Sequence, residues 1–153
     1  MDATESPQTE CIGHGDLAPW NVVFDRDRVV GVIDWDTARP MSRVWDLSYA
    51  AYHFLPLHPI EQLPDWGWDS PPDIRGRMRL FIEAYGAPLC ASELVSAAAV
   101  RLEGMAVHIE QEIARANPLY EVHRVEGHAS GYRAAASQLT DRLDLGEFEG
   151  IGL

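Results

Sequence analysis

The sequence predicts a mainly helical α+β domain, in which a small β-hairpin precedes several helices. Two short β-branched runs, at residues 21–24 and 29–33, flank a polar tetrapeptide, which is the pattern of a hairpin. Three later segments, at 73–85, 92–116 and 119–145, repeat apolar residues at helical spacing. The chain of 153 residues is long enough for one domain with a substantial core.

The predicted hairpin brings two metal-binding side chains to its open end. A turn centred between Asp27 and Arg28 places Asn21 opposite Asp34. Amide and carboxylate oxygens are hard ligands of the kind that Mg²⁺ prefers. Asp16 lies in the loop that enters the same end of the hairpin, near enough to act on a hydroxyl group. We therefore predict one site, with Asp16 as the catalytic residue and Asn21 and Asp34 as metal ligands.

The helices have recognisable start and stop signals. A first helix is expected over 46–55, because Asp46 suits an N-terminus and prolines follow. The stretch 56–72 is rich in Pro, Trp and Asp and is predicted to be a long irregular loop, whose tryptophans either stack on a substrate or pack over the core. Pro72 suits the first turn of the next helix and Gly86 suits its end.

The last two helices are expected to form an antiparallel pair. Ser92 is a good cap for the first of them, and Asn117-Pro118 ends it. The second is predicted to run without a break from 119 to 145, although Gly127 and Gly131 weaken it. Two long amphipathic helices with a short connection pack side by side in opposite directions.

Four short motifs occur in an order and spacing that are typical of kinases. The segment HGDLAPWN at 14–21 has the His-x-Asp-x-x-x-x-Asn spacing of a protein-kinase catalytic loop, with HGD in place of HRD. IDWD at 33–36 stands where protein kinases carry DFG, and VWDL at 44–47 resembles a segment whose Asp braces the catalytic loop. On these motifs the chain resembles the aminoglycoside phosphotransferase and choline kinase family.

This resemblance implies a fold and a domain organisation. The fold implied is the C-terminal helical lobe of a protein-kinase-like fold, spanning 11–153. Within it, the catalytic loop and hairpin occupy 12–36 and the helical part occupies 44–146. Residues 1–10 are polar and show no periodicity, and we expect them to be a disordered lead-in.

The resemblance also implies a reaction. It is the ATP- and Mg²⁺-dependent transfer of phosphate to the hydroxyl group of a small molecule, with Asp16 as the base and Asn21 and Asp34 on the metal. Within the family, His14 and Asp46 have structural roles. Outside a motif, Asp16 is an ordinary turn or cap residue, and the two predicted ligands simply open and close strands.

The N-terminal lobe of such a kinase has no counterpart here. Only 13 residues precede His14, where the family carries a β-sheet, a phosphate-covering loop and a lysine paired with a glutamate, and the sequence contains no lysine at all. We therefore expect a truncated lobe that is inactive alone or needs an N-lobe in trans. The alternative is a catalytically inactive kinase-like module for binding or oligomerisation, for instance a homodimer.

Composition bounds the partners and the location. The formal charge is −12, with 24 acidic and 12 basic residues, and nucleic acid is a poor partner for such a surface. Together with the motifs, this charge predicts a cationic acceptor, although acidic surfaces also simply keep proteins soluble. No apolar run has membrane-spanning length, the first residues lack the basic start and apolar stretch of a signal peptide, and Cys11 and Cys90 form no disulfide framework. We expect a cytoplasmic protein that does not bind membranes.

Overall fold

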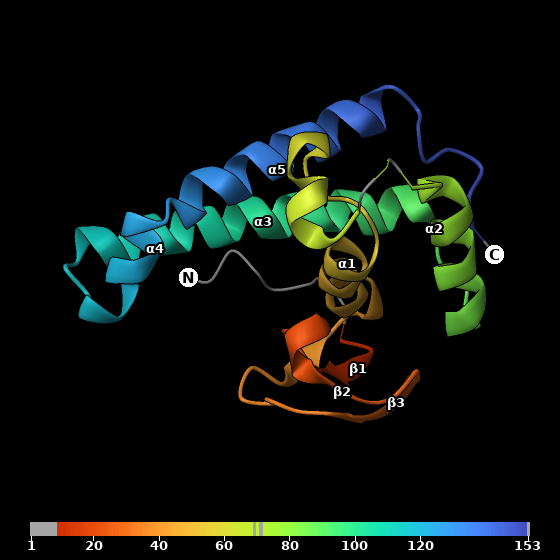
Figure 1. The fold of residues 1–153 in the computed structure, drawn as a ribbon, viewed down its shortest axis with the longest axis horizontal. Coiled ribbons are helices and arrows are strands. Elements are labelled where there is room, and N and C mark those ends of the chain that lie inside the picture. The colour runs from red at the N-terminus through yellow and green to blue at the C-terminus, as the bar shows by residue number, and fades with distance from the viewer. Residues whose placement is uncertain (1–8, 69, 71, 153) are drawn as a thin grey trace.

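The computed structural model describes residues 9–68, 70 and 72–152, so residues 1–8 of the expected lead-in lie outside the described residues. The described chain is mainly helical and contains two antiparallel sheets of two strands each, which confirms the predicted α+β class. Both sheets lie on one side of the molecule, and α1 lies between them and the long helices (Figure 1).

The strands form two separate pairs, and one pair corrects a prediction. The strands are β1 (Cys11–Gly13), β2 (Val22–Asp25), β3 (Arg28–Val32) and β4 (Arg39–Met41). β2 and β3 form the predicted hairpin. The sequence predicted only the hairpin strands, whereas β4 also forms and pairs with β1, with Gly13 opposite Arg39. Pro40 is tolerated there because a short two-stranded sheet has only edge strands.

The register of the hairpin also differs from the prediction. Val22 faces Val32, whereas a turn between Asp27 and Arg28 would have paired Val22 with Ile33. The chain reverses earlier, in a two-residue turn at Arg26 and Asp27. Arg26 adopts the left-handed conformation (φ 54°) that tight hairpin turns require. This turn shifts the pairing by two residues, and a bulge between positions 23 and 24 recovers one of them.

The helices follow most of the expected boundaries. They are α1 (Arg43–Phe54), α2 (Ile74–Tyr85), α3 (Ala91–Ala114), α4 (Glu121–Val125) and α5 (His128–Asp144), with 3-10 turns η1 (Pro19–Asn21), η2 (Ile60–Trp66) and η3 (Pro118–Tyr120). The side chain of Asp73 caps α2 by accepting from the Gly76 N–H at 2.9 Å. Gly86 ends this helix in a left-handed conformation, as predicted.

One predicted helix and one predicted loop differ from the structure. The segment 119–145 is not one helix, because Gly127 takes a left-handed conformation (φ 68°) and separates α4 from α5. A glycine adopts this conformation without the steric penalty of a side chain, so it breaks the helix where the amphipathic pattern continues. The loop 56–72 is also less irregular than expected, since it contains η2.

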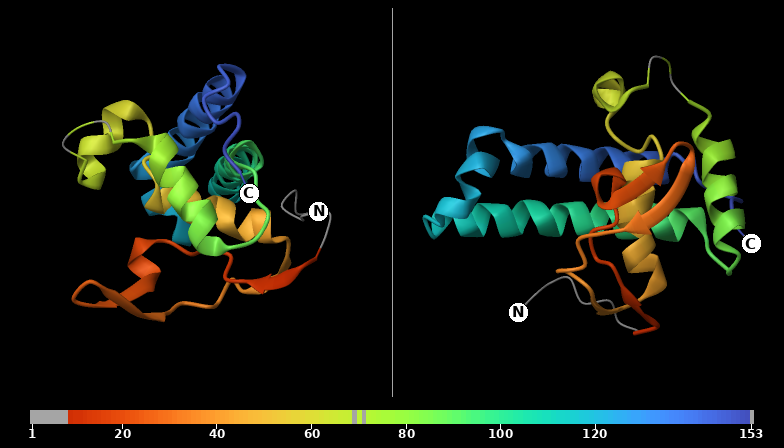
Figure 2. Two further views of the ribbon diagram at one scale, coloured as in Figure 1. Left: turned by 90° about the vertical axis from the view of Figure 1, so that its right-hand side faces the viewer. Right: turned by 60° about the horizontal axis from the view of Figure 1, so that its bottom comes forward.

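The core lies where α1 and α2 meet the antiparallel pair formed by α3 and α5. These two helices run side by side in opposite directions in Figure 1 and in the right-hand view of Figure 2, as the sequence predicted. Leu94 and Leu102 of α3 and Leu139 of α5 are fully buried there, and Phe148 of the C-terminal segment closes the same cluster. Among the helices of the described residues, none combines the length and the hydropathy needed to cross a bilayer.

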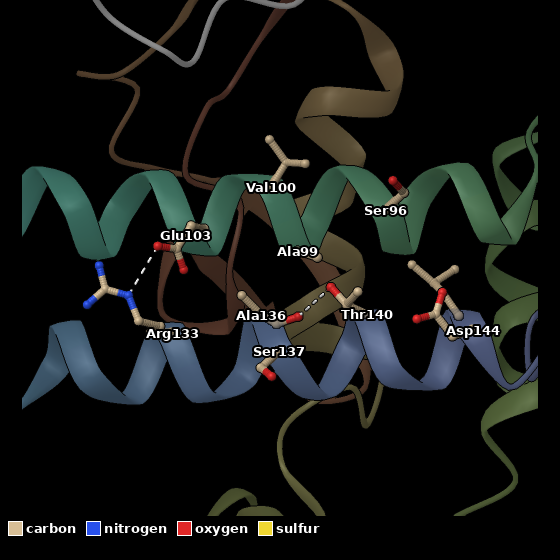
Figure 3. Close-up of a pocket in the computed structure, with 10 residues that line it drawn as sticks. Ser96, Ala99, Val100, Glu103, Arg133, Ala136, Ser137, Thr140 and Asp144 are labelled. Carbon is tan, nitrogen blue, oxygen red and sulfur yellow. Dashed lines mark hydrogen bonds and ion pairs between the residues drawn. The ribbon is translucent and has the colours of Figure 1, made fainter.

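A groove of about 590 Å³ runs along the exposed side of the α3–α5 pair (Figure 3). Small side chains such as Ala99 and Ala136 form its floor, and the ion pair between Arg133 and Glu103, 3.1 Å long, crosses it. None of the side chains predicted for the site lines this groove.

Candidate active site

The three predicted site residues lie at the ends of neighbouring elements. Asp16 is in the loop between β1 and η1, Asn21 is the last residue of η1, and Asp34 comes two residues after the end of β3. Asp16 is half-buried and Asp34 is exposed, whereas Asn21 is only 3% exposed. The hairpin therefore begins and ends beside the loop that carries Asp16.

Asn21 holds Asp16 directly, which the sequence did not predict. The Nδ2 atom of Asn21 donates to the main-chain oxygen of Asp16 at 2.8 Å and to its carboxylate Oδ2 at 3.0 Å. Both partners only accept hydrogen bonds, so the nitrogen of the amide must face Asp16. The amide oxygen of Asn21 is consequently left on the other side, where it can bind a metal ion.

Asp34 does not lie opposite Asn21 as predicted, because the pairing is shifted by one residue. The main-chain oxygen of Asn21 accepts from the Ile33 N–H at 3.0 Å, so Asn21 faces Ile33 instead of Asp34. The cause is the hairpin register described above. Asp34 itself adopts a left-handed conformation (φ 63°), which aspartate tolerates better than most residues. The chain thus turns out of the ladder at Asp34, directly after the residue that pairs with Asn21.

His14 links the catalytic loop to the end of the hairpin. Its Nδ1 atom accepts from the Asp16 N–H at 3.2 Å, so the ring proton lies on Nε2, which donates to the Ile33 main-chain oxygen at 2.9 Å. The ring is 3% exposed and packs 4.7 Å from the ring of Trp35. These contacts hold the backbone on both sides of the site, as expected for a structural histidine.

Asp46 braces the loop from the first turn of α1, which confirms the role expected for it. Its Oδ1 atom accepts from the Gly15 N–H at 2.9 Å. Gly15 adopts a left-handed conformation (φ 79°), and a Cβ atom there would lie 2.7 Å from the main-chain oxygen of Thr37. The Thr37 hydroxyl in turn donates to the His14 main-chain oxygen at 2.8 Å. A side chain at position 15 would therefore disrupt a loop that three elements hold.

Arg101 is the site-supporting residue that sequence reasoning missed. Its guanidinium donates to the main-chain oxygens of Gly15 and Trp45, the latter at 3.2 Å, and lies 4.3 Å from the centre of the Tyr49 ring. The side chain is 7% exposed, and burial lowers its pKa. One signal was present, since Arg101 comes seven residues after the buried Leu94 and so falls on the apolar face of α3.

The donor set fits a magnesium ion that takes most of its ligands from phosphate and water. Mg²⁺ in nucleotide-dependent enzymes binds one or two carboxylates and does not require a closed protein cage. The amide oxygen of Asn21 and the exposed carboxylate of Asp34 are the groups that could serve as such ligands. Within the described residues, no group of three or more His, Cys, Asp or Glu side chains is arranged to hold a metal.

Two histidines, the half-buried His53 and the buried His58, lie in an aromatic cluster. His53 packs 4.5 Å from Tyr49 and 4.7 Å from Trp20, and His58 stacks on Trp66 at 4.0 Å (ring centres). Both His53 nitrogens and Nε2 of His58 are buried and have no hydrogen-bond partner among the described residues. Burial lowers the pKa of His53 to about 3 and that of His58 to about 4. Trp66 packs on His58 with one face, although 41% of it stays exposed.

Acid is expected to destabilise the fold through these two histidines. An unfolded histidine has a pKa of 6.5, whereas the folded values are about 3 and 4. Their stabilising contribution is therefore complete above the unfolded pKa and is lost as the pH falls towards the folded values. From about pH 7.5 to pH 5 we expect the pair to account for a loss of roughly 2–4 kcal/mol in the free energy of unfolding, measured with urea.

A double variant provides the test of that assignment. The variant with His53→Phe and His58→Phe should lose most of this pH dependence, while His108→Gln, which changes an exposed histidine, should keep it. If the double variant responds to acid as the unmodified protein does, the two histidine rings are not the cause.

Comparison with known proteins identifies the family. The chain belongs to the phosphotransferase enzyme family, whose sequence profile matches residues 2–81, just over half of its length. It is also similar to the trifolitoxin immunity protein of Rhizobium leguminosarum bv. trifolii, with 32% identity over 75 residues. That match covers 49% of this chain and only 29% of the relative. No solved structure matches the chain.

Proposed function

We propose that the chain is the catalytic lobe of a kinase-like phosphotransferase, which transfers the terminal phosphate of ATP to the hydroxyl group of a small molecule. In this reaction Asp16 accepts the hydroxyl proton, the hydroxyl oxygen forms a bond to the terminal phosphorus, and the bond between that phosphorus and ADP breaks. The contact between Asn21 and the Asp16 carboxylate is the observation that carries the proposal, because it joins the base to a metal ligand.

The proposed metal ligands are Asn21 and Asp34. A bound Mg²⁺ supplies positive charge that offsets the negative charge of the nucleotide phosphates. The contribution of the chain is to present one neutral and one anionic oxygen at the open end of the hairpin. His14 and Asp46 keep the two sides of that end in place through the contacts described above.

We also propose that another polypeptide segment covers the hairpin. The exposed apolar side chains there are Ile12, Val23, Phe24, Val29, Val30, Ile33 and Trp35. A patch of this kind usually marks an interface. Because the sequence contains no lysine, a lysine that clamps the nucleotide must come from another segment or another molecule. We propose an N-lobe as the cover that also supplies this lysine. A second copy of the chain could cover the patch but has no lysine to supply, and a strictly monomeric sample in light scattering would contradict this second form.

A second candidate function is binding without catalysis. The relative named above is an immunity protein, and the apolar patch offers a surface for a partner. Such a module would use the family fold without transferring phosphate. Binding of metal and nucleotide at the predicted site separates the two candidates.

The test uses Mn²⁺ as a paramagnetic substitute for Mg²⁺, together with a non-hydrolysable ATP analogue. In isotope-labelled protein, NMR signals of Asp16, Asn21 and Asp34 are expected to broaden before any others. Little broadening is expected without the nucleotide, because phosphates provide much of the coordination. Broadening confined to the acidic C-terminal residues, such as Asp144 and Glu149, would contradict the proposed site. Asp27→Asn, at the exposed hairpin turn, is the control and should leave the pattern unchanged.

A further inference from the structure

A cleft of about 380 Å³ opens beside Asp16 and extends to the far end of α3. This volume is within the usual range for small-molecule sites. Asp16 is the only carboxylate among the described residues that line it, whereas Arg39 and Arg101 both line it. The cleft therefore has a local charge opposite in sign to the net charge of the chain, which is −12.

The two arginines contribute differently to this charge. Arg101 is buried, and the hydrogen bonds of its guanidinium go to neutral main-chain oxygens. It forms no ion pair within the described part of the chain, although the carboxylates of Asp16 and Asp46 lie near enough to act on its charge. Arg39 is exposed on β4, and none of the ion pairs between described residues involves it. Arg39 is thus the cation at the cleft that a ligand can reach.

Another part of the cleft lining is aromatic and rich in hydrogen-bonding groups. His108 of α3 lies with its Nε2 atom 2.9 Å from the hydroxyl of Tyr120 in η3. The ring of His123 in α4 packs 5.3 Å from that of Tyr120. The helix break at Gly127 leaves η3 and α4 folded back against α3, so this wall exists because the last helix is interrupted.

We propose that the acceptor is an anionic, ring-bearing hydroxyl compound whose carboxylate pairs with Arg39 and whose ring lies against the His108–Tyr120 wall. This inference rests on the proposed function, since it places the acceptor hydroxyl at Asp16. It replaces the cationic acceptor expected from net charge, because a cation in the cleft would meet two arginines and one carboxylate. Net charge describes the whole surface, whereas the choice of ligand depends on groups a few ångströms away.

The test compares three matched ligands by calorimetry, without nucleotide. They are para-(hydroxymethyl)benzoate, the cationic para-(aminomethyl)benzyl alcohol and neutral benzyl alcohol. The benzoate is expected to bind about tenfold more tightly than the cation, which is the effect of one favourable charge pair at a protein surface. Equal binding, tighter binding of the cation or no binding of the benzoate would overturn the inference.

Arg39→Gln tests the residue itself. The variant is expected to reduce the preference for the benzoate to about twofold or less, because the side chain keeps a polar end but loses its charge. Arg28→Gln is the control, since Arg28 is exposed on the hairpin and does not line the cleft. A preference that survives Arg39→Gln would also overturn the inference. Failure of the proposed function would give a different result. The benzoate would still bind in a way that depends on Arg39, but metal and nucleotide would not bind at Asn21 and Asp34.

Discussion

Asp16→Asn is expected to lower the rate of phosphoryl transfer about 100- to 10,000-fold, the usual contribution of a positioned general base. Asparagine has nearly the same shape as aspartate but cannot accept the hydroxyl proton. The Asn21 amide can still donate to the new side-chain oxygen, so the fold and the metal ligands should remain in place. The measurement is the formation of a phosphate ester from Mg²⁺-ATP and a panel of small alcohols, detected by mass spectrometry.

The control for this variant is Asp27→Asn, which makes the same chemical change at an exposed turn. It should transfer phosphate at the unmodified rate. The prediction concerns the ratio of the phosphoryl-transfer rates of the two variants and does not depend on the absolute rate. Product formation that is unchanged in Asp16→Asn would exclude Asp16 as the base. The absence of product from the unmodified chain is also expected if an N-lobe is needed in trans, so binding of metal and nucleotide at the predicted site then decides between the phosphotransferase and a binding module.

Arg101→Leu is expected to have the largest effect on stability, a loss of about 2–5 kcal/mol in the free energy of unfolding. The leucine removes the donors to the buried main-chain oxygens of Gly15 and Trp45 and the contact with the face of Tyr49. The Gly15 oxygen then loses this donor in a place that water reaches poorly, whereas the Trp45 oxygen still accepts from the Ser48 hydroxyl at 2.7 Å. Unfolding in urea, followed by circular dichroism, measures the loss.

Arg133→Leu is a matched control on the same helix pair. Arg133 forms its ion pairs with Glu103 and Glu110 at the surface, and its side chain is 45% exposed. Surface ion pairs contribute little, so we expect a change below about 1 kcal/mol. Equal losses in the two variants would show that Arg101 does not support the loop in the way described.

The sequence predicted the parts of the site that depend on local pattern. The order and spacing of the motifs singled out Asp16, Asn21 and Asp34, and the structure brings them to one end of the hairpin. The end of α2 was also predictable, because Gly86 acts within one turn of the helix, whereas its start is set by the Asp73 cap and Pro72 lies outside the first turn. Such signals depend on neighbouring residues alone.

The parts that were not predicted depend on small differences in turns or on distant contacts. A two-residue turn and a bulge set the hairpin register, and the β-branched pattern suits more than one register. The pairing of Gly13 with Arg39 joins segments that have no shared motif. Arg101 looked like an ordinary residue of a helix, since its significance lies in its contact with Gly15.

The contact between Arg101 and Gly15 also bears on the order in which the protein folds. The two residues are 86 positions apart, so the catalytic loop reaches its final shape only after α3 has docked. The segment that matches the family profile ends at residue 81 and so does not include this arginine. During synthesis, the motif-bearing segment leaves the ribosome well before the residue that fixes it. The catalytic loop is therefore completed late in folding. A correctly formed loop implies that the helical part has already assembled.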